Sequence, residues 1–219
     1  MKKSMKIKKS LYLLPAISSV LLSGCSVFGV SNVEEAKYQT VKQDGQYSIR
    51  HYDPVMVAEV SIKKESYDKS TNKAFNLLFD YITGANEGKQ MISMTAPVLN
   101  EAKESEKISM TAPVFIDQQS TGNWSMSFVL PADFTPDTTP IPTDPQVHVY
   151  LRKAQEVAVV RFSGTLSEDS RMKYTKLLES WIQDNGYKKG GRPVYAGYNP
   201  PWTIPAFRRN EVQILIESL

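Results

Sequence analysis

The sequence predicts an α+β domain in which two similar halves form a distorted antiparallel β-barrel or strongly curved sheet, flanked by two helices. One observation is an order of strand, strand, helix and strand that occurs twice along the chain. Another is a constant offset of 100 positions between apolar residues of the two halves. The matched pairs are Val57 and Val157, Ala58 and Ala158, Val60 and Val160, Leu77 and Leu177, Leu78 and Leu178, and Ile82 and Ile182. Two helices are too few to cover both faces of such a sheet, which favours curvature and a concave ligand site between the halves.

The first residues have the pattern of a bacterial lipoprotein signal. Five Lys residues precede an apolar run at residues 11–22, which is too short to be a stable membrane span. The tetrapeptide Leu22-Ser23-Gly24-Cys25 resembles a lipobox, in which cleavage frees the Cys for acylation. A lone Cys is more often an inert buried thiol, but the polar stretch at residues 31–44 offers nothing to bury it. We therefore expect a signal peptide at residues 1–24, a lipid on Cys25, a polar tether at residues 25–44 and a folded domain at residues 45–219.

Removal of this signal changes the charge of the chain. The 26 basic residues fall to 21, against 23 acidic ones, because residues 1–24 contain five Lys and no Asp or Glu. The mature chain therefore has a net charge of −2, which argues against a nucleic-acid partner. With no second Cys in the chain, disulfides and thiolate metal sites are excluded from the mature domain.

The first half begins with two strands, at residues 47–52 and 55–62, joined at Asp53-Pro54. A helix follows, because apolar residues then recur with the spacing i, i+3, i+4 and i+7, and Gly84 can end it. These apolar residues are Phe75, Leu78, Phe79 and Ile82. Residues 124–130 alternate as a half-buried strand.

A repeated heptad lies between these elements. Ile-Ser-Met-Thr-Ala-Pro-Val occurs at residues 92–98 and, unchanged, at residues 108–114. Both copies alternate β-branched or thioether residues with small polar ones, which predicts strands. The charged connection at residues 100–107 has a length that joins antiparallel neighbours, so local duplication of a hairpin accounts for the pairing.

The second half repeats the order of the first. Residues 147–152 and 157–162 predict two strands. An apolar helical stripe begins after Ser167, a suitable N-cap, and ends at Asn185-Gly186. A further strand follows at residues 212–216, and the Pro-rich residues 131–145 between the halves predict a stiff connection outside any sheet.

Two C-terminal motifs resemble the signature of the SOUL haem-binding family. They are Tyr198-Asn199-Pro200-Pro201-Trp202 and Arg208-Arg209-Asn210-Glu211-Val212. The Met-Thr-Ala-Pro-Val motif and residues 157–164 share the likeness, which runs from about Gly45 to the C-terminus. The resemblance implies a distorted β-barrel with two helices and internal pseudo-symmetry. It also implies reversible, non-covalent binding of haem or another tetrapyrrole in a hydrophobic groove.

His51 is the candidate iron ligand that this resemblance implies. The segment at residues 47–52 is similar to the one in the branch of the family whose His has been proposed as an axial ligand. Another branch lacks that His and is still credited with haem binding. His51 could equally be a strand-end residue hydrogen-bonded to a neighbour. His148 is the weaker candidate, because the alternation of its strand places it on the solvent face.

The first helix supplies the other candidate contacts. Phe75, Leu78 and Phe79 could meet the face of a porphyrin, although core packing is the commoner role for such residues. In the branch without the His, basic residues of this helix are assigned to the propionates, and Asn72 and Asp80 stand at those positions here. Two other basic residues lie close enough on the helix to substitute. They are Lys69 and Lys73.

Two further pairs of residues have two interpretations each. Met94 and Met110 occupy equal places in the heptads and could ligate haem iron, but Met is more often a core gap-filler. Arg208 and Arg209 could clamp carboxylates, and an ion-pair and turn network is the interpretation we favour.

We therefore expect a lipid-anchored, extracytoplasmic protein of the cell envelope that binds haem or another tetrapyrrole as a buffer, carrier or sensor. If the source has two membranes, Ser26 after the Cys favours the periplasmic face of the outer membrane. The alternative is a barrel-type module that binds another apolar small molecule or a peptide. We do not expect an enzyme, because the sequence has no nucleophile elbow, phosphate-binding loop or metal-ligand pair at helical spacing. A cofactor-dependent enzyme ranks last.

Overall fold

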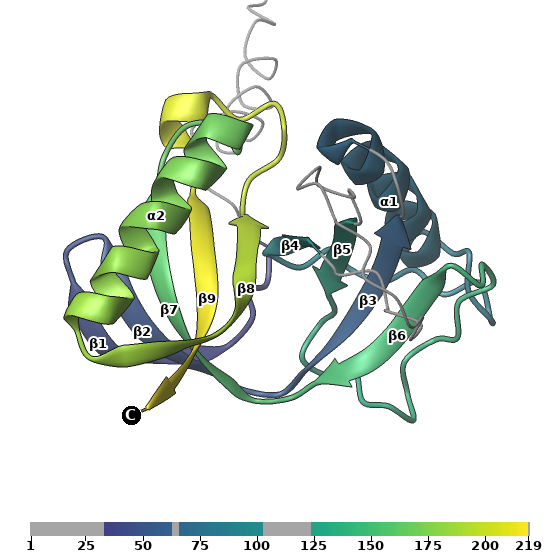
Figure 1. Ribbon diagram of the computed structural model, residues 1–219. Coiled ribbons are helices and arrows are strands. Elements are labelled where there is room, and N and C mark those ends of the chain that lie inside the picture. Colours follow the sequence, from purple (N-terminus) through teal and green to yellow (C-terminus); the bar gives the residue numbers. More distant parts are fainter. Residues whose placement is uncertain (1–32, 63–65, 103–123, 219) are drawn as a thin grey trace, which may run out of the picture.

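An antiparallel sheet and two helices make up the protein in a computed structural model, which describes residues 33–62, 66–102 and 124–218 (Figure 1). The strands are β1 (Tyr38–Asp44), β2 (Tyr47–Tyr52), β3 (Val55–Ile62), β4 (Val98–Ala102), β5 (Trp124–Val129), β6 (Val147–Arg152), β7 (Gln155–Phe162), β8 (Tyr187–Gly197) and β9 (Asn210–Ser218). The helices are α1 (Tyr67–Ile82), α2 (Glu168–Asp184) and the short 3-10 helix η1 (Pro205–Phe207). The α+β class is confirmed.

The sheet is open rather than closed into a barrel. Its nine strands follow the order β1-β2-β7-β9-β8-β4-β5-β3-β6, so β1 and β6 are edges that do not pair with each other. The expected barrel is corrected in this respect, because closure requires the two edges to exchange backbone hydrogen bonds. Figure 1 shows the sheet bent between β8 and β4, with α2 over one half and α1 at the other.

The two halves pair their strands in the same order. One half reads β6-β3-β5-β4 and the other reads β2-β7-β9-β8. Val57 of β3 lies opposite Tyr150 of β6, and Val157 of β7 lies opposite Arg50 of β2, so this register repeats at the offset of 100. The first strand of each half that the sequence predicts therefore pairs with the other half: β2 pairs with β7, and β6 pairs with β3. A pseudo-twofold relation between the complete halves stays a prediction.

Helix α1 buries its apolar side against β3 and β5. Ala74, Leu78, Tyr81 and Ile82 pack on a cluster of apolar side chains from those strands. The cluster includes Met56, Ala58, Val60, Ile62, Met126, Phe128 and Leu130. Thr83 ends the helix, and Gly84 continues the chain at φ +120°, a conformation that residues with a Cβ rarely adopt.

Helix α2 covers the other half of the sheet in the same way. Ser167 Oγ accepts a hydrogen bond from Ser170 N at 3.3 Å, which confirms the N-cap, and Gly186 follows the helix at φ +75°. Leu178, Trp181 and Ile182 pack on an apolar cluster from β2, β7, β8 and β9. No helix among the described residues is both long and apolar enough to cross a membrane.

Two segments differ from the sequence-based expectation. Residues 38–44 of the expected polar tether form β1, which pairs with β2; its side chains are exposed except for half-buried Tyr38, so no apolar alternation signals a strand. The first heptad is a strand only from Val98 onward, in β4. Its Pro97 has no N–H for a ladder, and Ala96 instead forms a single parallel bridge with Glu35. The second heptad lies outside the described residues.

Candidate functional site

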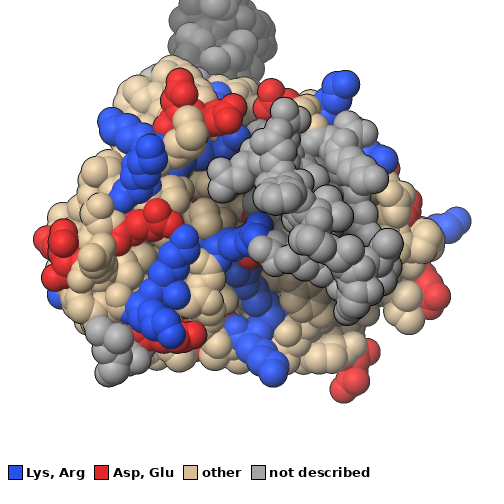
Figure 2. All heavy atoms as spheres, viewed as in Figure 1, with Lys and Arg blue, Asp and Glu red and all other residues tan. Residues whose placement is uncertain are grey.

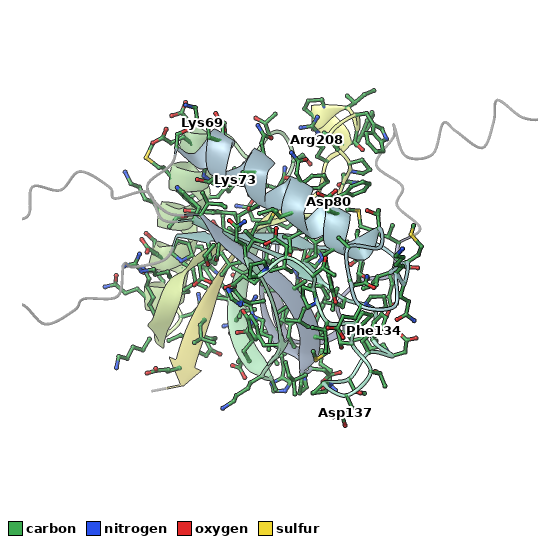
Figure 3. All side chains as sticks on the ribbon, turned by 90° about the vertical axis from the view of Figure 1, so that its right-hand side faces the viewer. Lys69, Lys73, Asp80, Phe134, Asp137 and Arg208 are labelled. Carbon is green, nitrogen blue, oxygen red and sulfur yellow. The ribbon has the colours of Figure 1, made fainter. Side chains whose placement is uncertain are left out.

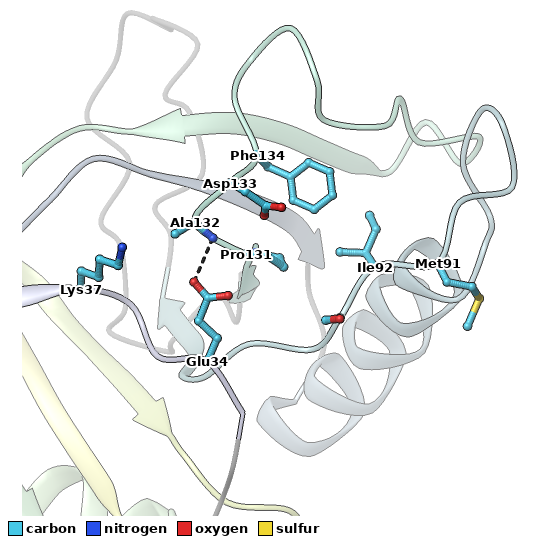
Figure 4. A pocket seen from close by; sticks show the side chains of 9 residues that line it. Glu34, Lys37, Met91, Ile92, Pro131, Ala132, Asp133 and Phe134 are labelled. Atoms are coloured by element: carbon cyan, nitrogen blue, oxygen red, sulfur yellow. Dashed lines mark hydrogen bonds between the residues drawn. The ribbon is translucent and has the colours of Figure 1, made fainter.

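A groove of about 660 Å³ opens beside the chain that leaves α1 (Figure 4). Three segments of the chain line it. They are residues 34 and 37 from the N-terminal segment, residues 91–93 after α1, and residues 131–134 after β5. Glu34 Oε1 accepts a hydrogen bond from Ala132 N at 3.1 Å, which ties the first segment to the third. The groove thus combines the apolar side chains of Ile92, Pro131 and Phe134 with the carboxylates of Glu34 and Asp133.

A second cavity of about 200 Å³ adjoins this groove and shares Glu34, Lys37, Ala132 and Phe134 with it. Thr95 lines the second cavity and is 3% exposed, yet its hydroxyl has no hydrogen-bond partner among the described residues. A buried hydroxyl without a partner is unfavourable, so a polar atom of a ligand or a water would stabilise it.

Helix α1 carries a stacked pair of aromatic rings and two exposed cations, and Figure 3 labels the cations, Lys69 and Lys73. Phe75 and Phe79 stack with ring centroids 5.9 Å apart, and Phe79 is 45% exposed. Lys69 and Lys73 lie exposed along the N-terminal part of the helix. Leu78 is fully buried, so its predicted contact with a ligand is replaced by core packing.

His51 does not lie near α1. It is an exposed residue of β2, opposite Gln39 of β1 and Glu156 of β7. Figure 1 shows β1 and β2 at the opposite end of the molecule from α1. The structure therefore does not bring His51 together with Phe75 and Phe79. His148 is exposed on β6, as the alternation of its strand predicts.

A buried charge network lies on the sheet face that the helices do not cover. Glu211 is fully buried. Its Oε2 lies 2.9 Å from Arg50 Nη1, and its Oε1 lies 2.9 Å from Arg209 Nη2. Tyr198 OH donates to the same carboxylate at 2.7 Å, and Gln213 Nε2 donates at 3.1 Å. Burial by itself raises the pKa of the Glu211 carboxyl. The two guanidiniums and the hydrogen bonds to the carboxylate lower this pKa by more than burial raises it, so the net shift is downward. Burial and the Glu211 charge raise the pKa of Tyr198 well above its usual range.

Arg208 and Arg209 stabilise the fold through internal contacts and do not line an open binding site. Arg209 also pairs with Glu35 at 2.9 Å and lies over the ring of Tyr198, while Arg208 donates to the carbonyls of Pro201 and Thr203. The favoured interpretation of these residues is confirmed. Met94 is 38% exposed, so the interpretation of Met94 as a core gap-filler is wrong.

Two features of the structure could not be predicted from the sequence. The role of Glu211 depends on Arg50, 161 positions away, and no local spacing signals that pair. The groove depends on the N-terminal segment, which polar composition had assigned to a tether. Among the described residues, no group of three or more His, Cys, Asp or Glu side chains is placed to hold a metal ion.

Comparison with protein families gives one match over most of the chain. The model of the family described as "SOUL heme-binding protein" matches residues 33–106 and 99–215.

Similar proteins carry related names. Heme-binding protein 2 of Homo sapiens is 29% identical over 174 residues, which is 79% of each chain. Its Mus musculus counterpart is 27% identical over the same length. Heme-binding protein 1 of Xenopus tropicalis is 23% identical over 185 residues, covering 84% of this chain and 91% of that protein.

Solved structures share the fold at lower identity. The C-terminal domain of EcmrR superposes with a TM-score of 0.58 at 16% identity, covering 83% of this chain and 99% of that domain. A hydrolase from Listeria innocua superposes with a TM-score of 0.50 at 10% identity, covering 81% and 94%. At these identities the likeness describes the fold alone.

Proposed function

Because this chain belongs to the SOUL heme-binding protein family, we propose that it binds haem or a related tetrapyrrole reversibly on the surface of α1. The observation that carries the location is the stacked pair of Phe75 and Phe79, which stays partly exposed on a helix that also carries two exposed Lys residues.

The side chains of α1 fit the apolar and anionic parts of a haem. A porphyrin is a flat apolar ring, and the rings of Phe75 and Phe79 lie within 13° of parallel, so they offer one apolar surface. Phe75 also meets Phe128 of β5 edge-on, which holds its ring in place. Lys69 and Lys73 are long and exposed, so their ammonium groups can reach two carboxylates at the edge of the ring.

Cations also lie between the two halves. Figure 2 shows Lys and Arg side chains gathered in a band down the middle of the face that is turned to the viewer in Figure 1. In Figure 1 β8 crosses the middle of the same view, and it carries Lys188, Lys189 and Arg192. Lys188 and Lys189 are paired with Glu217 and Glu179, so the anionic groups of a ligand would instead meet Lys69 and Lys73 of α1.

No His is placed to meet iron on the proposed surface. The chain has two His residues, and His51 lies on β2 away from α1. His148 points to the face of β6 opposite Val147 and Val149, which pack with α1. We therefore base binding on apolar contact and ion pairing, and ligation of iron by His51 stays a prediction for a separate surface.

The location of the protein belongs to the same proposal. We infer an extracytoplasmic protein held to a membrane by a lipid on Cys25, serving as a buffer, carrier or sensor of tetrapyrroles. The support is the lipobox-like Leu22-Ser23-Gly24-Cys25 after a charged and apolar leader.

A hemin titration followed by absorbance tests the proposed surface. Phe79→Ala should weaken hemin binding about tenfold, since loss of an apolar ring contact costs on the order of 1–2 kcal/mol. Phe207→Ala is the matched control, because Phe207 is 51% exposed in another part of the chain. Protoporphyrin without iron should bind with similar affinity.

The His variants distinguish the surfaces. His51→Ala and His148→Ala should leave affinity and the Soret band unchanged if α1 is the binding surface. A Soret shift in His51→Ala with no effect of Phe79→Ala would move the site to β2. The absence of saturable hemin binding by the parent would contradict the proposal.

In that last case the groove beside Glu34 supports the second candidate, a module that binds another apolar molecule. It combines apolar side chains with the unsatisfied hydroxyl of Thr95. Phe134→Ala should then weaken binding of the apolar probe 8-anilinonaphthalene-1-sulfonate, while Phe79→Ala should not.

A further inference from the structure

The loop between β8 and β9 exposes three large apolar side chains within six residues. Trp202 is 66% exposed, Ile204 is 41% exposed and Phe207 is 51% exposed. Single exposed apolar residues are common on soluble proteins, whereas a cluster that includes Trp marks an interaction surface.

Internal hydrogen bonds hold this loop in one shape. Arg208 Nε donates to Thr203 O at 2.8 Å, and Arg208 Nη2 donates to Pro201 O at 2.6 Å. Thr203 N donates to Pro200 O at 3.0 Å, and the Thr203 side chain is buried. One guanidinium therefore satisfies two carbonyls of the loop, and the loop folds around a buried residue.

The loop is also fixed to the body of the protein. Gly164 N donates to Pro205 O at 2.9 Å, and Arg209 N donates to Asn199 Oδ1 at 2.6 Å. Trp202 and Ile204 consequently project from a backbone that is ordered before any partner arrives, which lowers the entropy cost of binding.

We propose that this loop inserts its apolar side chains into the interface of a phospholipid bilayer. Trp is favoured at membrane interfaces because its ring is apolar while its N–H can reach water and headgroups. Ile204 and Phe207 would enter the acyl boundary beside it. Residues 198–210 contain two Arg and no Asp or Glu, so no carboxylate of the loop would have to leave water.

The position of the N-terminal segment favours a lipid bilayer as the partner of the loop. Glu35 pairs with Arg209, at the end of the same loop, at 2.9 Å. Nine residues separate Cys25 from Glu35, so the two can lie at most about 35 Å apart. A lipid on Cys25, which is part of the proposed function, would therefore hold the loop within reach of the membrane.

Quenching of Trp fluorescence by brominated acyl chains tests the insertion. The chain from residue 25 onward contains every described strand and helix, and Cys25→Ala removes the lipid, so binding depends on the loop and not on the anchor. With vesicles of phosphatidylcholine and phosphatidylglycerol, we expect saturable quenching. Trp202→Phe should abolish it with little loss of binding, whereas Trp181→Phe, at a residue only 8% exposed, should preserve it.

Co-sedimentation with the same vesicles gives an independent measure. The double variant Trp202→Ser/Ile204→Ser should lower partitioning about tenfold or more, because it removes two apolar contacts. Circular dichroism and hemin binding should match those of the parent, which separates a folding defect from a binding defect. Absence of co-sedimentation by the parent, or full quenching in Trp202→Phe, would overturn the proposal and leave hemin binding and lipidation unaffected.

Discussion

Glu211 shows how one residue joins distant parts of the chain. Its carboxylate is fully buried and contacts Arg50 of β2 and Arg209, which directly precedes β9, and Arg209 in turn pairs with Glu35. The isolated burial of a charge is very unfavourable, but paired guanidiniums and the Tyr198 hydroxyl compensate it here. The network therefore fixes the N-terminal segment, and with it the groove, to the central strands.

Glu211→Gln should lower the free energy of unfolding by about 3–5 kcal/mol, because it leaves two buried guanidiniums without a negative partner. Urea denaturation measures the loss. Glu217→Gln is the control, since Glu217 forms an exposed pair with Lys188 at 3.6 Å, and it should change stability by less than about 0.5 kcal/mol. Equal stability of the two variants would contradict the assigned role.

The same carboxylate predicts a dependence of stability on pH. The pKa of Glu211 is lowered in the folded protein from an ordinary value of 4.5, so its stabilising contribution is complete above pH 4.5. That contribution is lost as the pH falls through the lower pKa of the folded state. The free energy of unfolding of the parent should therefore fall more steeply in acid than that of Glu211→Gln, and parallel curves would contradict this.

At the scale of elements, the two helices depend on burial rather than on strong capping. Only α2 has a side-chain N-cap, and neither helix has a basic residue in its last turn. Each instead places one fully buried Leu against its half of the sheet, Leu78 in α1 and Leu178 in α2. Their shared offset of 100 was visible in the sequence, and both positions prove to be core positions.

Leu78→Ala and Leu178→Ala should each lower the free energy of unfolding by about 2–5 kcal/mol, because each leaves a cavity at a fully buried position. Leu177→Ala is the matched control on α2; Leu177 is 38% exposed and its truncation should cost about 1 kcal/mol or less. Chemical denaturation gives the three values. A Leu78 or Leu178 variant as stable as the parent would refute the equivalence of the two helices.

At the scale of the whole molecule, the apolar loop and the groove beside Glu34 lie in different regions. Figure 3 shows Arg208, which supports the loop, at the same end of the molecule as Lys69, with Phe134 of the groove farther toward the other end. A membrane at the loop would therefore leave the groove accessible from solution.

Cys25→Ala should abolish incorporation of a labelled fatty acid and release the protein from the membrane fraction, because Cys25 follows the lipobox-like residues directly. Metabolic labelling and fractionation of cells expressing the full chain measure both effects. Equal labelling and equal membrane retention of the variant and the parent would show that the lipid is not on Cys25.

The sequence by itself determined the elements that have a local signature. Alternation identified β2, β3, β5, β6 and most of β7, and helical spacing with Ser167, Gly84 and Gly186 identified both helices. These signals are local because side-chain periodicity depends on the geometry of a single strand or helix. The family motifs were readable for the same reason, as short runs of adjacent residues.

Tertiary structure alone decided which of these elements meet. Pairing of β2 with β7 moved His51 away from α1, and β1 joined the edge of the sheet through backbone hydrogen bonds that any residue can form. The partners of Glu211 and the lining of the groove come from segments far apart in the chain. Contacts at such separation depend on the order of strands in the sheet, which no local periodicity encodes.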